Sequence, residues 1–534
     1  MRRYIPKWTG VILFANFLAL AFRLRQRDLE FSIEPDFRWT LIKSWMDFLI
    51  TFNPILLPAP EPTVYLDGQY IVYAMVDGAL HWIADRVELF DAFFSNEISF
   101  ALGAALLTNI FAYASAGTVF YAAMVRLTGM VTISALMAVG LFLAPQMLDI
   151  NLVRVDFLIT LPLMVIFYCS CVLAVGQEQT RHAVVLGLAM AFAATLKLNG
   201  PFFGLIPALA AVASYRFDRA AIRRLARFIT ISIAVFLPVY IILMGRYFYY
   251  YSPLGILQFY KDSIALIDKW AVISAEPPSY YHIDLMTESG LPFIALYLTC
   301  AAAIVLLAFL QCCRRAIFLA LVFVVFSAGG MLTMKYSRGG YHLLPIFFAV
   351  IGFTAAAVMH SAANRFLKAA LATAGALIFA LSMQTSHTKY QTVVAQRESE
   401  AVGIQALKRE PRDWLLARIP LGTHICIQTD SEWTLPPLDG FKVIYGPLNL
   451  PYLDLLAFGN AQPPSLEALK QECPIVVTSD LHRNMYDSFL ERVSIEAAAQ
   501  WRDFFIALNQ SYPPTVFSSA VPIYATAIEV NDLR

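Results

Sequence analysis

The chain has 534 residues, of which 59% are hydrophobic and 14% are charged, and its mean hydropathy is +0.62. These values lie outside the usual range of soluble globular proteins and are typical of a polytopic membrane protein. The net charge of +1 argues against electrostatic binding of nucleic acid. No glycine-rich loop with nucleotide-binding spacing stands out, so nucleotide chemistry is disfavoured as well.

Apolar runs long enough to cross a bilayer recur along the first 384 residues. A membrane-spanning helix needs roughly 17–25 apolar residues, or fewer where neighbouring helices shelter it. The opening MRRYIPKW and the apolar run behind it lack a small-residue cleavage site, so we interpret this run as a retained first helix. We expect about eleven spans, at residues 8–22, 100–124, 129–148, 157–175, 183–196, 202–215, 228–244, 291–310, 316–334, 343–359 and 369–383.

Basic residues set the expected orientation, because loops rich in Lys and Arg stay on the cytoplasmic side. If the N-terminus is cytoplasmic, the N-terminal segment and the cytoplasmic connections carry most of the basic residues near the spans. These are Arg2, Arg3, Lys7, Arg126, Arg181, Arg216, Arg219, Arg223, Arg224, Arg227, Arg314, Arg315, Arg365 and Lys368. The fifth and sixth predicted spans are short. If both are removed as a pair, every later connection stays on the same side of the membrane. Three polar regions then face outward: 23–96, 247–290 with its aromatic run YFYYYS, and everything after 384.

The first and third outer regions have structure of their own in this interpretation. Within 23–96, the amphipathic stretch VYLDGQYIVYAMVDGALHWIADRV favours helix lying in the membrane interface rather than spanning it. The last region, 385–534, is polar and mixed: THICIQTD, FKVIYG, CPIVVTSD and PIYATAIEV predict short strands, and 485–508 predicts a helix. We therefore expect a membrane domain at 1–384 and a small extracytoplasmic α/β domain at 385–534. Cys426 and Cys473 would be able to pair there in an oxidising compartment, although two cysteines alone do not establish a disulfide.

Charged side chains from several connections fall at the outer edge of the predicted spans. Such charges usually face a protein interior or an aqueous cavity. The set comprises Glu34 and Asp36 in FSIEPDFRW, Arg154 and Asp156, Lys197 with Asn199, and Lys335, Arg338 and His342. Together they suit a polar cleft that holds an anionic headgroup.

Sugar transfer from a lipid phosphate to a hydroxyl would use such a set. The reaction needs a carboxylate that accepts the proton of the hydroxyl, and cations that stabilise the departing phosphate. Glu34 or Asp36 fits the first role. Lys197, Arg338 and His342 fit the second, because a phosphate leaving group needs its charge neutralised more than it needs a proton.

Each assignment has a simpler structural alternative. The EPD sequence also suits a solvated turn in which Asp36 caps the next helix. Arg154 and Asp156 suit a structural pairing with other helices, and Lys197 suits a side chain that reaches to the interface. Arg338 and His342 share a helix face only if the helix begins before Gly339 and Gly340, and a lone histidine is more often a hydrogen-bonded interior residue. The shared side of these residues, rather than any one of them, favours a functional site.

Three stretches carry a resemblance to a known class. They are SIEPDF in the first outer loop, TLKLNGPFFGLIP, and KYSRGGYHLLPIFF near the penultimate predicted span. This pattern resembles the GT-C class of membrane glycosyltransferases, especially the branch that includes protein O-mannosyltransferases and the lipid A aminoarabinose transferase. The resemblance covers the organisation of residues 1–383. Where family members commonly have two adjacent acids, EPD separates them by a proline, which leaves open whether Glu34 or Asp36 is the base.

The resemblance implies a fold, a reaction and a location. It implies a GT-C-like helical domain, a polyprenyl-phosphate-linked sugar donor, inverting transfer to a lipid, glycan or protein acceptor on the outer face, and placement in the bilayer of a bacterial inner membrane. By position, Asp36 or Glu34 is the implied base and Lys197, Arg338 and His342 the implied phosphate ligands. Arg154, Asp156, Asn199 and Tyr341 are candidates for substrate binding or structure. We expect no cofactor and no metal, with a divalent ion bound by the carboxylates as the alternative.

Two other function classes compete with this interpretation. A transporter or flippase for a lipid or small anion would place ionisable residues near the bilayer midplane and would show repeated halves, which the sequence lacks. A polysaccharide polymerase or ligase would share the many helices and the outer site, but a large outer loop between late spans would be expected there instead of a C-terminal domain.

Overall fold

The computed structural model describes a set of helices and a sheet near the C-terminus. The described residues are 5–25, 39–52, 57, 60, 66–86, 97–144, 147, 155–198, 200–214, 218–273, 291–310, 314–333, 344–360, single positions between 369 and 407, 409–427, 438, 440–444, 448, 462–480, 496–518 and 527–534. The chain divides into two compact units. One comprises Met1–Leu29, Phe37–Ser263 and Glu276–Gln391, and the other comprises Glu30–Asp36, Ile264–Ala275 and Thr392–Arg534.

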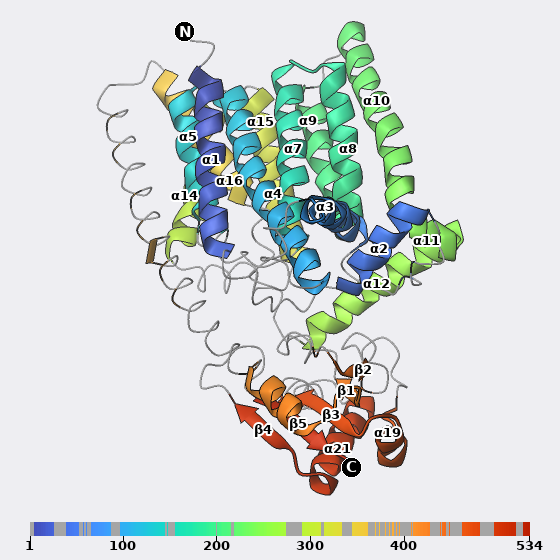
Figure 1. Ribbon diagram of the computed structural model, residues 1–534. Coiled ribbons are helices and arrows are strands. Elements are labelled where there is room, and N and C mark those ends of the chain that lie inside the picture. Colours follow the sequence, from blue (N-terminus) through green and yellow to red (C-terminus); the bar gives the residue numbers. More distant parts are fainter. Residues whose placement is uncertain are drawn as a thin grey trace. The chain divides into compact units, whose positions relative to one another are not determined.

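The first unit is a helical bundle. Its long helices run roughly side by side along one direction (Figure 1). They are α1 (Ile5–Arg25), α4 (Glu97–Thr128), α5 (Val131–Phe142), α7 (Val155–Val175), α8 (Thr180–Leu196), α9 (Leu205–Ser214, preceded by the 3₁₀ helix η2, Gly200–Gly204), α10 (Arg219–Leu243), α14 (Leu291–Leu310), α15 (Arg314–Thr333) and α16 (Leu344–His360). The first ten predicted spans coincide with these helices, and 369–383 lies mostly outside the described residues.

Three stretches of the described helices are long and apolar enough to cross a membrane: Phe100–Thr128, Leu158–Val175 and Arg219–Leu243. Shorter apolar helices of 10–17 residues accompany them, at Pro6–Phe22, Val131–Phe142, Thr180–Leu196, Gly200–Ser214, Leu298–Leu307 and Leu344–His360. The expected number of about eleven spans therefore stays a prediction.

The bundle core is built from aromatic rings and from glycines at close helix crossings. Phe167 of α7 stacks between Phe120 of α4 and Phe318 of α15, with ring centroids 6.1 and 6.2 Å apart, and all three side chains are buried. A Cβ built on Gly187 of α8 would lie 2.5 Å from the carbonyl oxygen of Ser232 in α10. Small residues at such crossings let helix backbones approach closely, which is how helices associate where the hydrophobic effect contributes little.

Hydrogen bonds identify the connections that meet at each end of the bundle. At one end, the Arg126 guanidinium at the end of α4 donates to the side chain of Gln177 before α8 over 2.9 Å. The Arg315 guanidinium of α15 donates over 2.9 Å to the carbonyl oxygen of Leu127 in α4. At the other end, the amide of Leu66 donates to the carbonyl oxygen of Leu196 over 3.1 Å. The bundle thus brings the polar connections of each end into contact.

Shorter helices lie at the end of the bundle where α8 terminates: α2 (Trp39–Thr51), α3 (Gly68–Ala84) and α11 (Gly245–Tyr250). There α3 lies across the direction of the long helices (Figure 1). Its buried residues include Tyr73, whose hydroxyl lies 3.2 Å from the side-chain nitrogen of Asn109 in α4. The predicted amphipathic helix of the first outer region is therefore a helix, and it does not run along the bundle.

The second unit contains a five-stranded mixed sheet of order β2-β1-β3-β5-β4. Its strands are β1 (His424–Ile427), β2 (Lys442–Ile444), β3 (Ile475–Ser479), β4 (Thr515–Ser518) and β5 (Ala527–Asp532). Strand β1 pairs in parallel with β2 and β3, whereas β5 is antiparallel to both β3 and β4. Helices α19 (Leu466–Glu472) and α21 (Glu496–Ser511) accompany the sheet.

The predicted strands and the helix of this region match the structure unevenly. Strands β1, β2 and β3 lie inside three of the predicted stretches, and β5 covers the second half of the fourth. Strand β4 and helix α19 are not predicted, because four and seven residues are too few to show a clear hydrophobic period. The predicted helix at 485–508 overlaps α21, which ends three residues later, while 481–495 lies outside the described residues.

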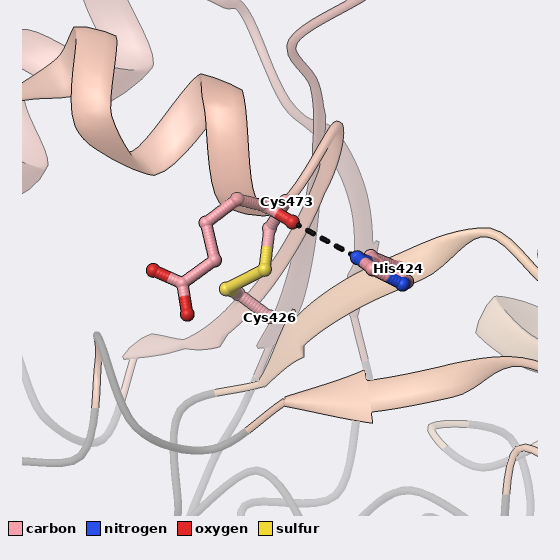
Figure 2. Close-up of a disulfide and its surroundings, with 4 residues drawn as sticks. His424, Cys426 and Cys473 are labelled. Atoms are coloured by element: carbon pink, nitrogen blue, oxygen red, sulfur yellow. Dashed lines mark hydrogen bonds between the residues drawn. A yellow bond between two sulfur atoms is a disulfide. The ribbon is translucent and has the colours of Figure 1, made fainter.

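A disulfide between Cys426 and Cys473 joins strand β1 to the end of α19. Their Cα atoms lie 5.5 Å apart, within the range that a disulfide requires, and both side chains are buried. Figure 2 shows the bond beside His424, whose Nδ1 lies 3.3 Å from the carbonyl oxygen of Glu472. The pairing that the sequence left open is therefore present.

Candidate functional site

Of the predicted site residues, Lys197 is the one whose side-chain environment the structure describes. Lys197 follows the last residue of α8 with φ −147° and ψ 148°, and its side chain is half-buried. Asp156 belongs to α7, but its side chain lies outside the described residues. The other predicted residues lie outside the described residues entirely: Glu34, Asp36, Arg154, Asn199, Lys335, Arg338, Tyr341 and His342.

A tight turn fixes the backbone of Lys197. The amide of Gly200 donates to the carbonyl oxygen of Lys197 over 2.8 Å, and this turn leads into η2. A Cβ built on Gly200 would lie only 1.7 Å from the carbonyl oxygen of Ala193, so no side chain fits at this position. The GlyPro pair at 200–201 therefore ends α8 and folds the chain back against it. Lys197 is held at the end of the bundle by this turn.

The first outer region docks next to Lys197. The amide of Leu66 donates to the carbonyl oxygen of Leu196, the residue before Lys197. A Cβ built on Gly68 would lie 2.7 Å from the carbonyl oxygen and the side-chain oxygen of Thr195. Glycine at the first position of α3 thus permits a backbone approach that other residues would block. The start of α3 is thus packed on the C-terminal end of α8.

A buried ion pair joins the residue before α3 to α11. The Nη1 atom of Arg246 in α11 lies 2.8 Å from Oδ1 and 3.0 Å from Oδ2 of Asp67, the residue that precedes α3. The side chains are 6% and 3% exposed. Buried charges are costly unless they are paired and hydrogen-bonded, and this geometry supplies both conditions. Asp67 therefore holds α11 against the start of α3.

Tyrosines of the aromatic run add further contacts to the first outer region. The hydroxyl of Tyr247 donates to the Asp67 carboxylate over 3.5 Å. Burial raises the pKa of Tyr247 well above its usual value, and the negative charge of Asp67 raises it further. The phenol therefore stays protonated as a donor. Tyr250 and Tyr251 donate to the backbone carbonyl oxygens of Leu57 and Pro60 over 2.5 and 2.6 Å.

These contacts bring three distant segments together in one junction. We define the junction by Leu66, Asp67, Gly68, Thr195, Leu196, Lys197, Arg246 and Tyr247. The sequence pointed to Lys197 as a candidate, which stays a prediction, and it showed the aromatic run, but Asp67 and Arg246 were not predicted. Their only signal is that each is a lone charge beside an otherwise apolar or aromatic stretch, LDGQY and GRYFYY.

The described residues contain no cluster of three or more His, Cys, Asp or Glu side chains that would hold a metal ion. The junction itself presents cations, a phenol and a carboxylate that is paired with an arginine. The Arg246 charge is balanced by Asp67, and Lys197 lies one residue from the docked segment. Such an arrangement suits the binding of an anionic group at this end of the bundle.

Comparison with known proteins shows the fold. No protein-family model matches the chain, and no curated protein matches it in sequence. Among solved structures, ArnT from Cupriavidus metallidurans bound to undecaprenyl phosphate matches with a TM-score of 0.59 and 12% identity over 98% of both chains. The oligosaccharyltransferase of Archaeoglobus fulgidus, tethered to an acceptor peptide, matches with a TM-score of 0.50 and 13% identity over 98% of this chain and 75% of that chain. Both are GT-C glycosyltransferases, and this chain has a GT-C-like fold.

Proposed function

We propose that the chain is a membrane glycosyltransferase that moves a sugar from a polyprenyl-phosphate-linked donor to a hydroxyl group of a lipid, glycan or protein acceptor. The observation that carries the proposal is the likeness to ArnT, which extends over 98% of both chains. ArnT, the lipid A aminoarabinose transferase, is bound to undecaprenyl phosphate in that structure. A fold alone hosts more than one function, so residues at the site must carry the rest of the argument.

In the proposed reaction, the acceptor oxygen attacks the anomeric carbon of the sugar while the bond between that carbon and the phosphate oxygen breaks. Attack from the opposite face inverts the configuration. The acceptor proton passes to a carboxylate of the first outer loop, Asp36 or Glu34, acting as general base. The bonding electrons leave with the polyprenyl phosphate, whose growing negative charge Lys197, Arg338 and His342 stabilise.

The geometry around Lys197 supports its part in this scheme. The residue is fixed at the end of α8 by the turn to Gly200, and the first outer region docks on the preceding residue through Leu66. Cationic groups held in place before the reaction stabilise developing charge without reorganising. The junction thus holds Lys197 beside Leu66. The two candidate bases lie outside the described residues, and their meeting with Lys197 is part of the proposal.

The proposed location is a bacterial inner membrane, with the N-terminus in the cytoplasm and the sheet-bearing region on the outer side. Two observations support this placement. The basic connections alternate with the helices as the positive-inside rule requires. The disulfide between Cys426 and Cys473 is typical of an oxidising compartment such as the periplasm. We propose a reaction without a metal ion.

The decisive experiment measures transfer by the purified full-length chain from a panel of polyprenyl-phosphate sugars. Glu34→Gln and Asp36→Asn are compared singly, and Lys197→Ala is compared with Lys197→Arg. We expect one of the two carboxylate variants to lose at least a hundredfold in rate, because a general base typically contributes 10²–10⁴-fold. Lys442→Gln is the matched control, since it removes one exposed cation from β2.

Two results would overturn the proposal. One is that no donor in the panel is consumed by the wild-type chain, and the other is that both carboxylate variants keep full activity. Movement of an intact lipid-linked sugar across a vesicle membrane would favour the flippase alternative. Polymerisation of lipid-linked repeats without a separate acceptor would favour the polymerase alternative.

A further inference from the structure

Helix α10 is far less buried by the rest of the protein than the other long apolar helices α4 and α7. Only 6% of the residues in its apolar window are buried, whereas 78% are buried in the corresponding windows of α4 and α7. Its buried residues are Phe228 and Leu243, and its packing partner is α8, through the crossing at Gly187. The rest of its apolar surface is exposed, with Ile233 at 49%, Leu237 at 48% and Ile241 at 51%. In a membrane protein such a surface contacts lipid.

The same exposed face is basic at its beginning. Arg219, Arg223, Arg224 and Arg227 occupy the first three turns of α10, and all four are exposed. At 3.6 residues per turn, Arg219 lies in line with Leu237 and Arg223 with Ile241, since each pair is separated by about five full turns. The line of side chains that contacts lipid tails therefore ends in guanidinium groups. We name the four arginines the basic end of α10.

Nothing in the described part of the chain neutralises the basic end. Its first turn contains no acidic residue, and the Asp218 carboxylate before it accepts a hydrogen bond from the amide of Ala220 over 3.2 Å. Cations at the N-terminus of a helix are disfavoured by the helix dipole, so this placement lowers the stability of the isolated helix. An anion supplied from outside the protein would offset that cost.

Figure 1 shows that α10 begins beyond the ends of the neighbouring α8 and α9. Its 25 residues rise about 37 Å at 1.5 Å per residue, enough to cross the hydrocarbon core of a bilayer and reach into the headgroups. The opposite end of α10 leads to Arg246 and the junction, so the basic end lies on the other side of the bundle from Lys197. It is separate from the proposed donor site.

We propose that the basic end of α10 is a binding site for anionic phospholipids of the leaflet that it enters. Clusters of four or more Arg or Lys residues directly beyond a membrane helix attract anionic headgroups, and the exposed apolar line above them accommodates the acyl chains. The guanidinium groups donate hydrogen bonds to the lipid phosphate in pairs. The chemical class of the ligand is thus a phospholipid with net negative charge, as opposed to a zwitterionic one.

The test counts lipids bound to the full-length chain in a non-ionic detergent by native mass spectrometry. Phosphatidylglycerol and phosphatidylcholine with the same acyl chains are the two probes. The variant replaces Arg219, Arg223 and Arg227 by Gln. We expect the wild-type chain to bind phosphatidylglycerol more tightly than phosphatidylcholine. The variant should bind phosphatidylglycerol more weakly than the wild-type chain does, by roughly fivefold for each arginine removed. Raising the salt concentration should weaken the wild-type preference, because exposed charges are screened.

Two further variants make the result specific. Replacing the same three arginines by Lys keeps the charge and should retain most of the preference. Replacing Arg412, Lys442 and Arg502 by Gln removes three cations from the second unit. This variant should keep the wild-type preference for phosphatidylglycerol. Equal wild-type affinity for the two lipids, unaltered phosphatidylglycerol binding by the Gln variant, or loss of the preference in the Lys variant would each overturn the proposal. Sugar transfer is not part of this readout, so failure of the proposed function would leave the result intact.

Discussion

Asp67 and Arg246 are 179 residues apart in the sequence, yet the guanidinium of Arg246 donates to both carboxylate oxygens of Asp67 over 2.8 and 3.0 Å. One residue precedes α3 and the other lies at the start of α11. The pair therefore fixes α11 onto the start of α3. Asp67 directly follows Leu66, whose amide bonds to the end of α8, so the ion pair lies one residue from the backbone contact that adjoins Lys197.

The two side chains of this ion pair should be energetically coupled. Asp67→Ala or Arg246→Ala leaves a buried charge without compensation, and each should lower the free energy of unfolding by about 3–5 kcal/mol. The double variant leaves no charge behind, so its loss should be smaller than the sum of the single losses. Thermal unfolding of the purified chain in detergent measures all three. Strictly additive losses would show that the two side chains are not energetically coupled.

Hydropathy was sufficient to predict the long helices, because a helix in lipid must present an apolar surface along its length. It was less informative about their ends. Helix α4 begins three residues before the predicted span and ends four residues after it, since polar residues continue a helix once it has formed. Strand β3 was predictable from its run of β-branched residues and β1 from its alternating isoleucines, whereas β4 was not predicted.

The junction could be predicted only in part. Lys197 interrupts an apolar run, and this interruption is visible in the sequence. The partners of Asp67 and Gly68 are set by tertiary packing, and no spacing rule connects them to Arg246 or Thr195. Tyr250 and Tyr251 bond to backbone carbonyl oxygens, which every residue carries, so the sequence holds no matching signal. The role of Lys197 in phosphate binding stays a prediction. So do the roles of Glu34, Asp36, Arg338 and His342, which lie outside the described residues.

Gly68 should be intolerant of a side chain. In Gly68→Ala the new methyl group would meet the carbonyl oxygen of Thr195 at 2.7 Å, so α3 must move away from the end of α8. We expect a loss of about 1–3 kcal/mol in the free energy of unfolding and a lower rate of sugar transfer. Gly78→Ala in the same helix is the control, because its nearest neighbour would be Met46 at 3.9 Å. That variant should be neutral or more stable by up to about 1 kcal/mol, and equal losses in both variants would contradict the crowding at Gly68.

The tyrosine hydroxyls of the second outer region should differ in their contributions. Tyr251→Phe removes the hydrogen bond to Pro60 and should cost about 1 kcal/mol in the free energy of unfolding. Tyr249→Phe is the control, since its side chain is 55% exposed and its described contact is a ring contact with Tyr250. Chemical denaturation of both variants in detergent gives the comparison. A loss in Tyr249→Phe as large as that in Tyr251→Phe would argue against the bond to the 57–60 segment.

The disulfide should stabilise the sheet-bearing unit rather than the bundle. Cys426 and Cys473 are 47 residues apart, and closing a loop of that length removes chain entropy from the unfolded state worth about 4 kcal/mol. Cys426→Ala with Cys473→Ala should therefore make the second unit more sensitive to proteolysis. Cys300→Ala, which removes a free buried thiol of α14, should not. Thiol labelling of the unfolded chain before and after reduction tests the bond directly, because Cys426 and Cys473 should react only after reduction. Full labelling of both residues without a reductant would show that the disulfide does not form in the cell.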